Sequence, residues 1–146
     1  MTIEQFSQSL PILLYRTLAA IMPRFRRIFT DAGLTEQQWR VLRVLWDQHE
    51  VVFRELADLT LIAPPSLVGV IDRLETRGLV SRRRSTSDRR AVDISLTAEG
   101  RSIEKQVMPA VASVYADLMQ SVDPIVWQQL LAGLEKVTDA SQPKRR

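Results

Sequence analysis

Residues 63–98, APPSLVGVIDRLETRGLVSRRRSTSDRRAVDISLTA, decide the fold. The first half of this stretch predicts a helix with Pro64 in its first turn, where the missing N–H costs nothing, and with Gly78 at its end. The second half predicts two strands, residues 80–84 and 91–96, joined by a polar loop. The helix has one apolar stripe at helical spacing, formed by Leu67, Val70, Ile71 and Leu74. The second strand alternates with a period of two, Val92, Ile94 and Leu96 against Ala91, Asp93 and Ser95.

Three helices are predicted before this stretch. Apolar residues at helical spacing mark a long amphipathic helix over residues 9–29, and Pro23 should kink it. The sequence from Thr35 to Gln38 is a capping box, which opens a second helix that runs to about residue 48. A short third helix covers residues 54–61.

Two more helices are predicted after the strands. Thr97 caps the first of them, and Pro109 should bend it. The second covers residues 123–137 and is followed by a tail, residues 141–146, that is expected to fray.

Helices followed by two strands are typical of a winged helix-turn-helix, so the predicted fold class is mainly α with a small β-wing. We expect an N-terminal dimerisation helix in residues 1–32, a DNA-binding lobe in 33–98, and C-terminal dimerisation helices with a basic tail in 99–146. The flanking helices are too few to enclose their own apolar stripes, so burial against a second copy in a homodimer is expected. A monomer whose terminal helices pack on its own lobe is the alternative.

Composition excludes several kinds of site. The chain has no Cys and a single histidine, His49, which rules out disulfides, thiolate or histidine-rich metal sites and a Ser/His triad, and no cofactor is expected. No apolar run is long enough to span a membrane and no leader precedes the first helix, which predicts a cytoplasmic, nucleoid-associated protein. An enzyme is the rival class, with Asp72 and Glu75 as acid and base. Both fall on the outer face of a charged helix, however, and no nucleophile elbow, phosphate loop or metal cluster accompanies them.

Positive charge is concentrated on residues 73–90. Seven arginines oppose Glu75 and Asp88 there, for a charge of +5, whereas the whole chain carries only +3. Electrostatic steering and counterion release act locally, so such a concentration is typical of a surface that binds double-stranded DNA. An ordinary solvated charged face is the alternative.

The second helix of a helix-turn-helix lies in the major groove. The residues at its start that lie off the apolar stripe are therefore candidate base contacts: Ala63, Pro64, Pro65, Ser66, Val68 and Gly69. Ser66 could bond a base or a phosphate and Val68 could touch a thymine methyl, but neither reads a base through two hydrogen bonds. A plain solvated helix face is the alternative.

The end of this helix and the wing supply candidate contacts to the phosphate backbone of DNA, namely Arg73, Arg77, Arg82, Arg83, Arg84 and Ser85. In the wing loop, Asp88 lies two residues before Arg90, so its carboxylate could accept from the guanidinium and hold it extended. The negative potential of a narrow minor groove attracts such an arginine. A wing salt bridge without a ligand is the alternative.

Three segments together resemble the multiple antibiotic resistance regulator (MarR) family: LTEQQWRVL at 34–42, PSLVGVIDRLETRGLV at 65–80 and DRRAVDISLTAEG at 88–100. The resemblance implies a two-fold dimer, formed by the N- and C-terminal helices, that binds palindromic DNA and often represses transcription until a small ligand binds. It also implies that Asp88 orients Arg90 and that Arg90 enters the minor groove. The chain departs from the family pattern at Val68 and Gly69, where members commonly have Thr and Arg, which shifts weight from base readout to the wing and DNA shape.

The first two segments are also similar to the branch that controls catabolism of homoprotocatechuate and hydroxyphenylacetate, which implies a small aromatic acid as effector. In the family the effector pocket lies between the dimerisation helices and the DNA-binding lobe. Arg16, Trp39 and Arg43 could supply a carboxylate partner and an aromatic wall there. The alternative is that Trp39 belongs to the core and that the two arginines face solvent or pair with acids.

A sequence-neutral architectural protein is the remaining rival, because a winged helix can also compact DNA. A footprint restricted to one or a few operators would distinguish a regulator from such a protein.

Overall fold

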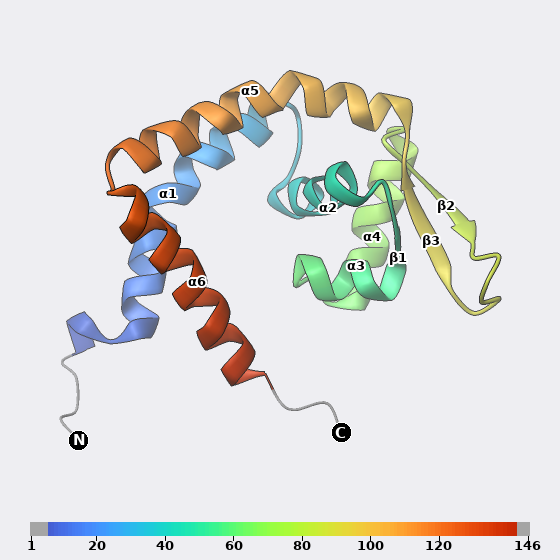
Figure 1. The fold of residues 1–146 in the computed structure, drawn as a ribbon. Coiled ribbons are helices and arrows are strands. Elements are labelled where there is room, and N and C mark those ends of the chain that lie inside the picture. The colour runs from blue at the N-terminus through green and yellow to red at the C-terminus, as the bar shows by residue number, and fades with distance from the viewer. Residues whose placement is uncertain (1–5, 143–146) are drawn as a thin grey trace. The chain divides into compact units, whose positions relative to one another are not determined.

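The computed structural model describes residues 6–142 (Figure 1). Its elements, in chain order, are the 3₁₀ helix η1 (Phe6–Gln8), α1 (Leu10–Asp31), α2 (Glu36–Gln48), β1 (Glu50–Val52), α3 (Phe53–Thr60), α4 (Pro64–Thr76), β2 (Val80–Arg84), β3 (Val92–Leu96), α5 (Ala98–Gln120) and α6 (Pro124–Ser141). The chain forms two compact units, Met1–Pro109 and Ala110–Arg146, which meet inside α5. The predicted division at residues 32 and 98 stays a prediction.

The helices form where their periodicity and caps predict them. The capping box of α2 is complete, because Thr35 Oγ1 accepts from the N–H of Gln38 at 3.2 Å and Gln38 Oε1 accepts from the N–H of Thr35 at 3.0 Å. Asp123 caps α6, which runs beyond the predicted end to Ser141, so that residue is helical; residues 143–146 of the expected frayed tail lie outside the described residues. α1 and α5 are continuous through Pro23 and Pro109.

The chain packs the start of α5 closely against the end of α4. Thr97 caps α5 by accepting from the N–H of Gly100 at 3.0 Å, and its hydroxyl donates to the carbonyl of Gly78 at 2.6 Å. Gly78 has a φ of +71°, the left-handed region that favours glycine, which explains why α4 ends here. A Cβ at Gly100 would lie 2.3 Å from the carbonyl oxygen of Leu79, so only glycine fits at this crossing.

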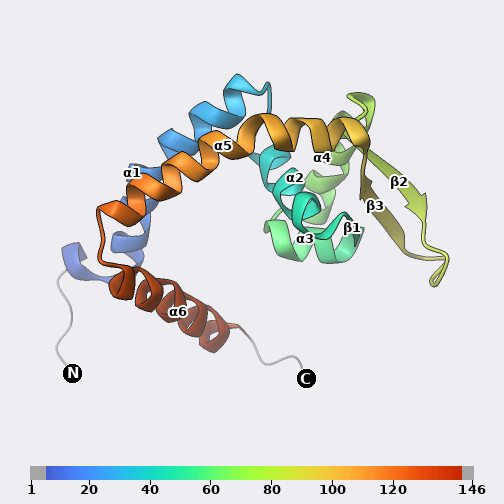
Figure 2. The ribbon, with the colours of Figure 1, turned by 45° about the horizontal axis from the view of Figure 1, so that its top comes forward.

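The strands form an antiparallel sheet in the order β1-β3-β2 (Figure 2). β1 was not predicted, because three residues are too few for a periodic signal. Its presence makes β3 the central strand, with Asp93 opposite Val52 on one side and Arg83 on the other. In this central position Asp93 is only 9% exposed, so the alternation along β3 does not place every polar side chain at the surface.

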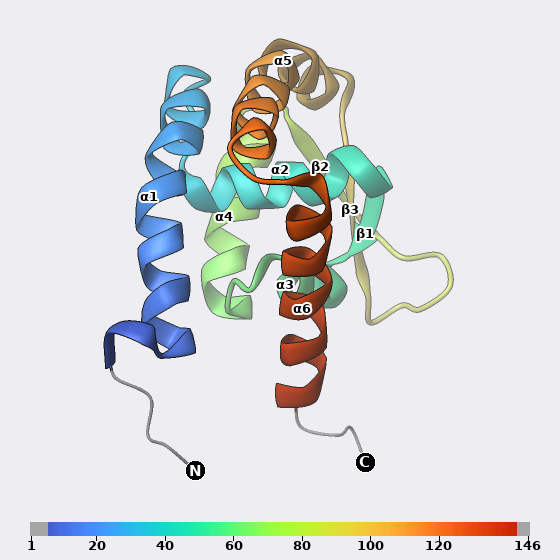
Figure 3. The same cartoon turned by 60° about the vertical axis from the view of Figure 1, so that its left-hand side comes forward.

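The core of the winged lobe, by which we mean α2 to β3, lies between its helices and the sheet. α2 runs across α4 (Figure 3), and both contact α3. The side chains that this arrangement buries completely include Leu42, Leu45, Leu56, Leu67, Ile71, Leu74 and Ile94. The predicted stripe of α4 is therefore confirmed as its core face, and the opposite face is left for other contacts.

Two of the flanking helices, α1 and α6, keep much of their apolar surface exposed. In α1 only Phe25 and Phe29 are buried, and α6 has no buried residue. Large hydrophobic side chains that are at least a third exposed include Leu10, Leu13, Leu14 and Leu18 on α1 and Ile125, Val126, Leu130, Leu131 and Val137 on α6. The predicted apolar stripes of α1 and α6 thus keep many exposed side chains, whereas that of α5 is buried at Val107, Val111 and Val114.

Candidate nucleic-acid interface

The helix-turn-helix is formed by α3 and α4, and the start of α4 faces outward as predicted. Its stripe is buried, whereas Ala63, Pro64, Pro65, Ser66 and Val68 are exposed and Gly69 is half-buried. Val68 in particular is 45% exposed although it is apolar. The candidate base contacts therefore share one accessible helix face.

Arg73 lies next to Gly69 on α4. A Cβ built at Gly69 would lie 3.6 Å from Nη1 of Arg73, an ordinary van der Waals distance. The missing side chain at Gly69 leaves the helix surface open, and the Arg73 guanidinium occupies part of it. Where family members commonly have an arginine, this chain has Gly69. Arg73, one turn later, extends its side chain back toward that position.

The turn between α3 and α4 contains a feature that the sequence analysis missed. Leu61 has a φ of +54° and is 84% exposed, although a left-handed backbone is costly for a side chain with a Cβ. The preceding carbonyl, of Thr60, accepts from Nη1 of Arg40 on α2 at 3.0 Å. The turn that orients α4 is therefore fixed by a long-range contact, and a run of apolar letters gives no signal for it.

Two of the predicted phosphate-contacting arginines have partners within the chain. Arg77 Nη1 donates to the carbonyl of Gly33, in the turn between α1 and α2, at 2.7 Å. Arg82 pairs with Asp72 and, through Nε at 2.8 Å, with Glu75, both on α4. The hydrogen bond to Asp72 and the negative charge of Glu75 raise the pKa of Arg82 above its ordinary value. Both side chains thus contribute to the arrangement of the winged lobe.

The rest of the wing places cations and hydroxyls at its surface. Arg83 pairs with Glu50 of β1 at 3.0 Å, across the sheet. Arg84 is exposed at the end of β2, and the hydroxyl of Ser85 lies 3.0 Å from that of Ser87 at the start of the loop. Among residues 6–142, no ion pair occupies the guanidinium groups of Arg73, Arg84 and Arg90, so these three cations are available to a phosphate backbone.

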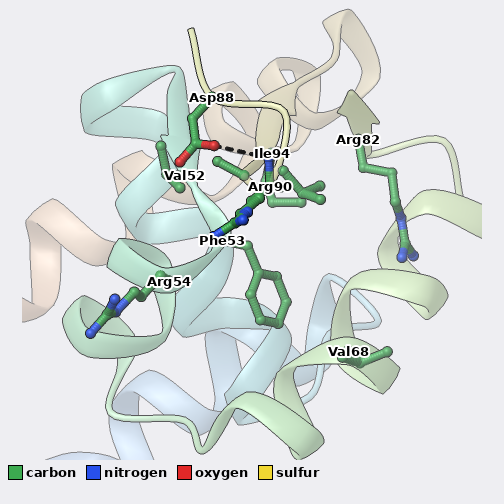
Figure 4. Close-up of a pocket in the computed structure, with 10 residues that line it drawn as sticks. Val52, Phe53, Arg54, Val68, Arg82, Asp88, Arg90 and Ile94 are labelled. Atoms are coloured by element: carbon green, nitrogen blue, oxygen red, sulfur yellow. Dashed lines mark hydrogen bonds between the residues drawn. The ribbon is translucent and has the colours of Figure 1, made fainter. Parts of the chain in front are cut away.

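The predicted contact between Asp88 and Arg90 exists but joins different atoms. The Asp88 carboxylate accepts from the backbone N–H of Arg90 at 2.9 Å, not from the guanidinium (Figure 4). The reason is the spacing, because an aspartate carboxylate readily reaches the N–H two residues later in a tight turn. The Asp88 carbonyl also accepts from the N–H of Ala91 at 2.9 Å. Asp88 therefore fixes the backbone of the loop and leaves the Arg90 guanidinium free.

A cleft of about 580 Å³ separates the wing from the helices. Its lining comes from the start of α3 (Phe53, Arg54), from α4 (Val68) and from the wing (Arg82, Arg90, Val92). Figure 4 shows Phe53 extending from the start of α3 toward the part of α4 that carries Val68. Phe53 and Arg54 were not predicted from the sequence, and with Val68, Arg82 and Arg90 they combine apolar and cationic side chains in one cleft.

The predicted effector residues are only partly brought together. Trp39 is buried, with its ring centroid 5.7 Å from that of Phe29 and 5.6 Å from that of Trp46. Arg43, half-buried on the next turn of α2, lies 5.9 Å from the centre of the Trp46 ring. Arg16 is exposed on α1, and among residues 6–142 no hydrogen bond or ion pair joins it to the other two.

Arg43 has an unusual partner for a half-buried cation. Its Nη1 lies 3.3 Å from the thioether sulfur of Met108 on α5, which is a weak acceptor. Within the described part of the chain, no carboxylate pairs with it. A half-buried guanidinium beside aromatic rings can bind an aromatic carboxylate through an ion pair and ring contact.

Other kinds of site receive no support from the described residues. Within residues 6–142, no group of three acidic or histidine side chains is placed to hold a metal ion. No helix in the same range is long and apolar enough to cross a membrane.

Comparison with known proteins identifies the family. Residues 34–92 match the model of the MarR family. The HTH-type transcriptional regulator FarR of Neisseria gonorrhoeae is 36% identical over 136 residues, which cover 90% of this chain and 92% of FarR. The homoprotocatechuate degradative operon repressor of Escherichia coli is also 36% identical, over 128 residues that cover 88% of this chain and 86% of the repressor.

Solved structures agree with the sequence comparison. The crystal structure of NadR in complex with 4-hydroxyphenylacetate superimposes with a TM-score of 0.80 at 34% identity, covering 94% of this chain and 99% of NadR. FarR and the Escherichia coli protein are regulators of transcription, which agrees with the interpretation of this chain as a regulator and not as an enzyme. The chain belongs to the MarR family of winged helix-turn-helix transcriptional regulators.

Proposed function

We propose that the protein is a homodimeric repressor that binds palindromic operator DNA and is released from it by a small aromatic carboxylic acid. The observation that carries this proposal is the pairing of an outward-facing α4 with a wing whose Arg90 backbone is held by Asp88. The start of α4 would enter the major groove, and Arg90 would enter the adjacent minor groove. Such a protein would act in the cytoplasm, at the nucleoid.

The phosphate backbone would be contacted by the arginines without a partner in the described chain. Arg73 is exposed on α4 and Arg84 is exposed on the wing. Base contacts from Ser66 and Val68 would add less, because neither side chain forms two hydrogen bonds to one base. Specificity would therefore depend strongly on groove width and DNA deformability, in addition to direct contacts.

Dimer formation is supported by the uncovered apolar faces of α1 and α6. A soluble monomer rarely exposes many large hydrophobic side chains on neighbouring turns of one helix, whereas a two-fold interface buries them. Two copies would also present two recognition helices, as a palindromic operator with half-sites about one helical turn apart requires.

The effector class is supported by Arg43 and by two relatives. Arg43 is a half-buried cation beside Trp46 and one turn from Trp39, and within residues 6–142 the thioether of Met108 is the hydrogen-bond acceptor for its guanidinium. NadR was crystallised with 4-hydroxyphenylacetate, and the Escherichia coli relative is named for homoprotocatechuate degradation. Both compounds join an aromatic ring to a carboxylate. An acid of this class would pair with Arg43 and stack against the aromatic wall, with Arg16 as a second cation.

A footprint on DNA from the region upstream of the protein's own gene tests the proposal. A regulator protects one or a few short segments, and an aromatic acid such as 4-hydroxyphenylacetate removes the protection. Protection of the whole fragment would instead favour an architectural protein. Sedimentation of the free protein at the mass of two chains would support the dimer, and a single-chain mass would contradict it.

A further inference from the structure

Arg82 connects the wing to the recognition helix through two acids. Asp72 and Glu75 lie three residues apart and so share one face of α4. Both pair with the guanidinium of Arg82 on β2, and Glu75 Oε1 also accepts from the backbone N–H of Arg82 at 3.3 Å. We call these three side chains the Arg82 cluster. Figure 4 shows Arg82 pointing from the wing toward α4.

The Arg82 cluster is unsuited to binding phosphate. Nη2 of Arg82 faces Asp72 and Nε faces Glu75, so two donor positions are already used. With two carboxylates and one guanidinium the cluster also carries a net negative charge, which repels a phosphate group. The side chain is only about a third exposed. Arg82 therefore differs from Arg84, two residues later, which is exposed and unpaired within residues 6–142.

The position of Arg82 along the wing gives the cluster its effect. Arg82 lies opposite Ile94 in the sheet, and Ile94 is completely buried. Beyond this point the hairpin continues through Arg84 to the loop with Asp88 and Arg90. A wing fixed to α4 at Arg82 cannot pivot freely about its base, so the loop keeps one orientation relative to the recognition helix.

We propose that Asp72 and Glu75 hold Arg82 so that the recognition helix and the wing engage DNA as one rigid unit. Arg82 is in this view a positioning residue for Arg90, not a phosphate ligand. The inference rests on the proposed DNA-binding function and deepens it. It also explains why two acids are placed on a helix that must approach a polyanion, where they would otherwise weaken binding.

Removing the acids distinguishes positioning from phosphate contact. If Arg82 bound phosphate, the double variant Asp72→Asn/Glu75→Gln would free it and would bind DNA more tightly. If Arg82 positions the wing, that variant binds upstream DNA roughly tenfold more weakly despite its more positive charge. Arg82→Gln should lose a similar amount, and the triple variant should lose no more than either, because all three changes break the same contacts.

Three matched variants act as controls. Glu55→Gln removes an exposed acid from the first turn of α3, outside the cluster, and should leave binding unchanged or stronger. Arg84→Gln removes a candidate phosphate contact and should lower the slope of log affinity against log salt by roughly 0.9, whereas Arg82→Gln should leave that slope unchanged. Arg82→Lys keeps the charge but loses the planar fork, so it should resemble Arg82→Gln.

Hydrogen exchange of the free protein gives a readout without DNA. The double acid variant should speed exchange of the wing amides in residues 84–91 and leave exchange in α2 unchanged, which also shows that the fold is intact. Tighter DNA binding by the double acid variant, or a lower salt slope for Arg82→Gln, would overturn the inference and leave the proposed function standing. Failure of the wild-type protein to bind any DNA would instead overturn the proposed function.

Discussion

The carboxylate of Asp88 accepts a hydrogen bond from the backbone N–H of Arg90 at 2.9 Å. This contact closes the loop of the wing and leaves the arginine side chain unpaired among the described residues. Asp88 thus positions the backbone of Arg90, whereas the guanidinium of Arg90 stays free to adjust to the width of a groove.

Asp88→Ala should weaken binding to upstream DNA, whereas Asp88→Asn should weaken it much less. Asparagine retains a side-chain oxygen that can accept from the same N–H, and alanine does not. Loss of one such bond at an exposed site costs about 0.5–1.5 kcal/mol, which is roughly two- to tenfold in affinity. Fluorescence anisotropy with labelled DNA measures the difference. Equal losses in the two variants would show that the charge of Asp88 matters and not its hydrogen bond.

Gly100→Ala should destabilise the fold, because its Cβ would meet the carbonyl oxygen of Leu79 at 2.3 Å. Backbone atoms cannot move away cheaply, so a loss of about 1–3 kcal/mol in the free energy of unfolding is expected. Gly133→Ala in α6 is the matched control, since its Cβ would meet nothing within 4 Å and alanine favours a helix by about 1 kcal/mol. Thermal denaturation should therefore move in opposite directions for the two variants.

Leu61→Gly should stabilise the protein although it removes a large side chain. Leu61 has a φ of +54° and is 84% exposed, so glycine relieves left-handed strain of about 1 kcal/mol and loses little buried surface. Leu61→Ala keeps a Cβ and should give no such gain. Denaturant unfolding of both variants checks this, and a less stable glycine variant would mean that the exposed leucine makes a stabilising contact.

Arg43→Met should abolish the response to an aromatic acid and keep DNA binding. The change removes the positive charge beside Trp46 that is proposed to pair with a carboxylate, while methionine keeps similar bulk next to Met108. Tryptophan fluorescence, titrated with 4-hydroxyphenylacetate, should saturate for the wild-type protein and not for the variant. Arg16→Ala tests the second proposed cation in the same way. A normal titration by Arg43→Met would place the acid elsewhere.

Local patterns in the sequence predicted most of the fold. Thr35 and Gln38 are close in the chain, and so the capping box of α2 could be recognised from spacing alone. The buried stripe of α4 and the hairpin that follows Gly78 were predicted for the same reason. β1 was missed, because three residues have no period and become a strand only by pairing with β3.

Long-range partners could not be predicted in this way. Nothing in the sequence distinguishes Arg77 and Arg82 from Arg84. In the structure, however, Arg77 donates to the carbonyl of Gly33, and Arg82 pairs with two acids of α4. The same limit applies to Arg40, whose contact with Thr60 crosses from α2 to the turn before α4. Predicting that a basic segment binds DNA required only charge, whereas predicting which arginines remain free required the tertiary structure.

The most direct test of the wing assignment compares the wild-type protein with Arg90→Ala by anisotropy, using upstream and unrelated DNA at two salt concentrations. The wild type should bind the upstream fragment more tightly than unrelated DNA, and its affinity should fall as salt rises. Arg90→Ala should bind more weakly, and its slope of log affinity against log salt should be lower in magnitude by roughly 0.9. Equal binding of the two proteins to both DNAs, or binding by neither, would contradict the role of Arg90 in the minor groove.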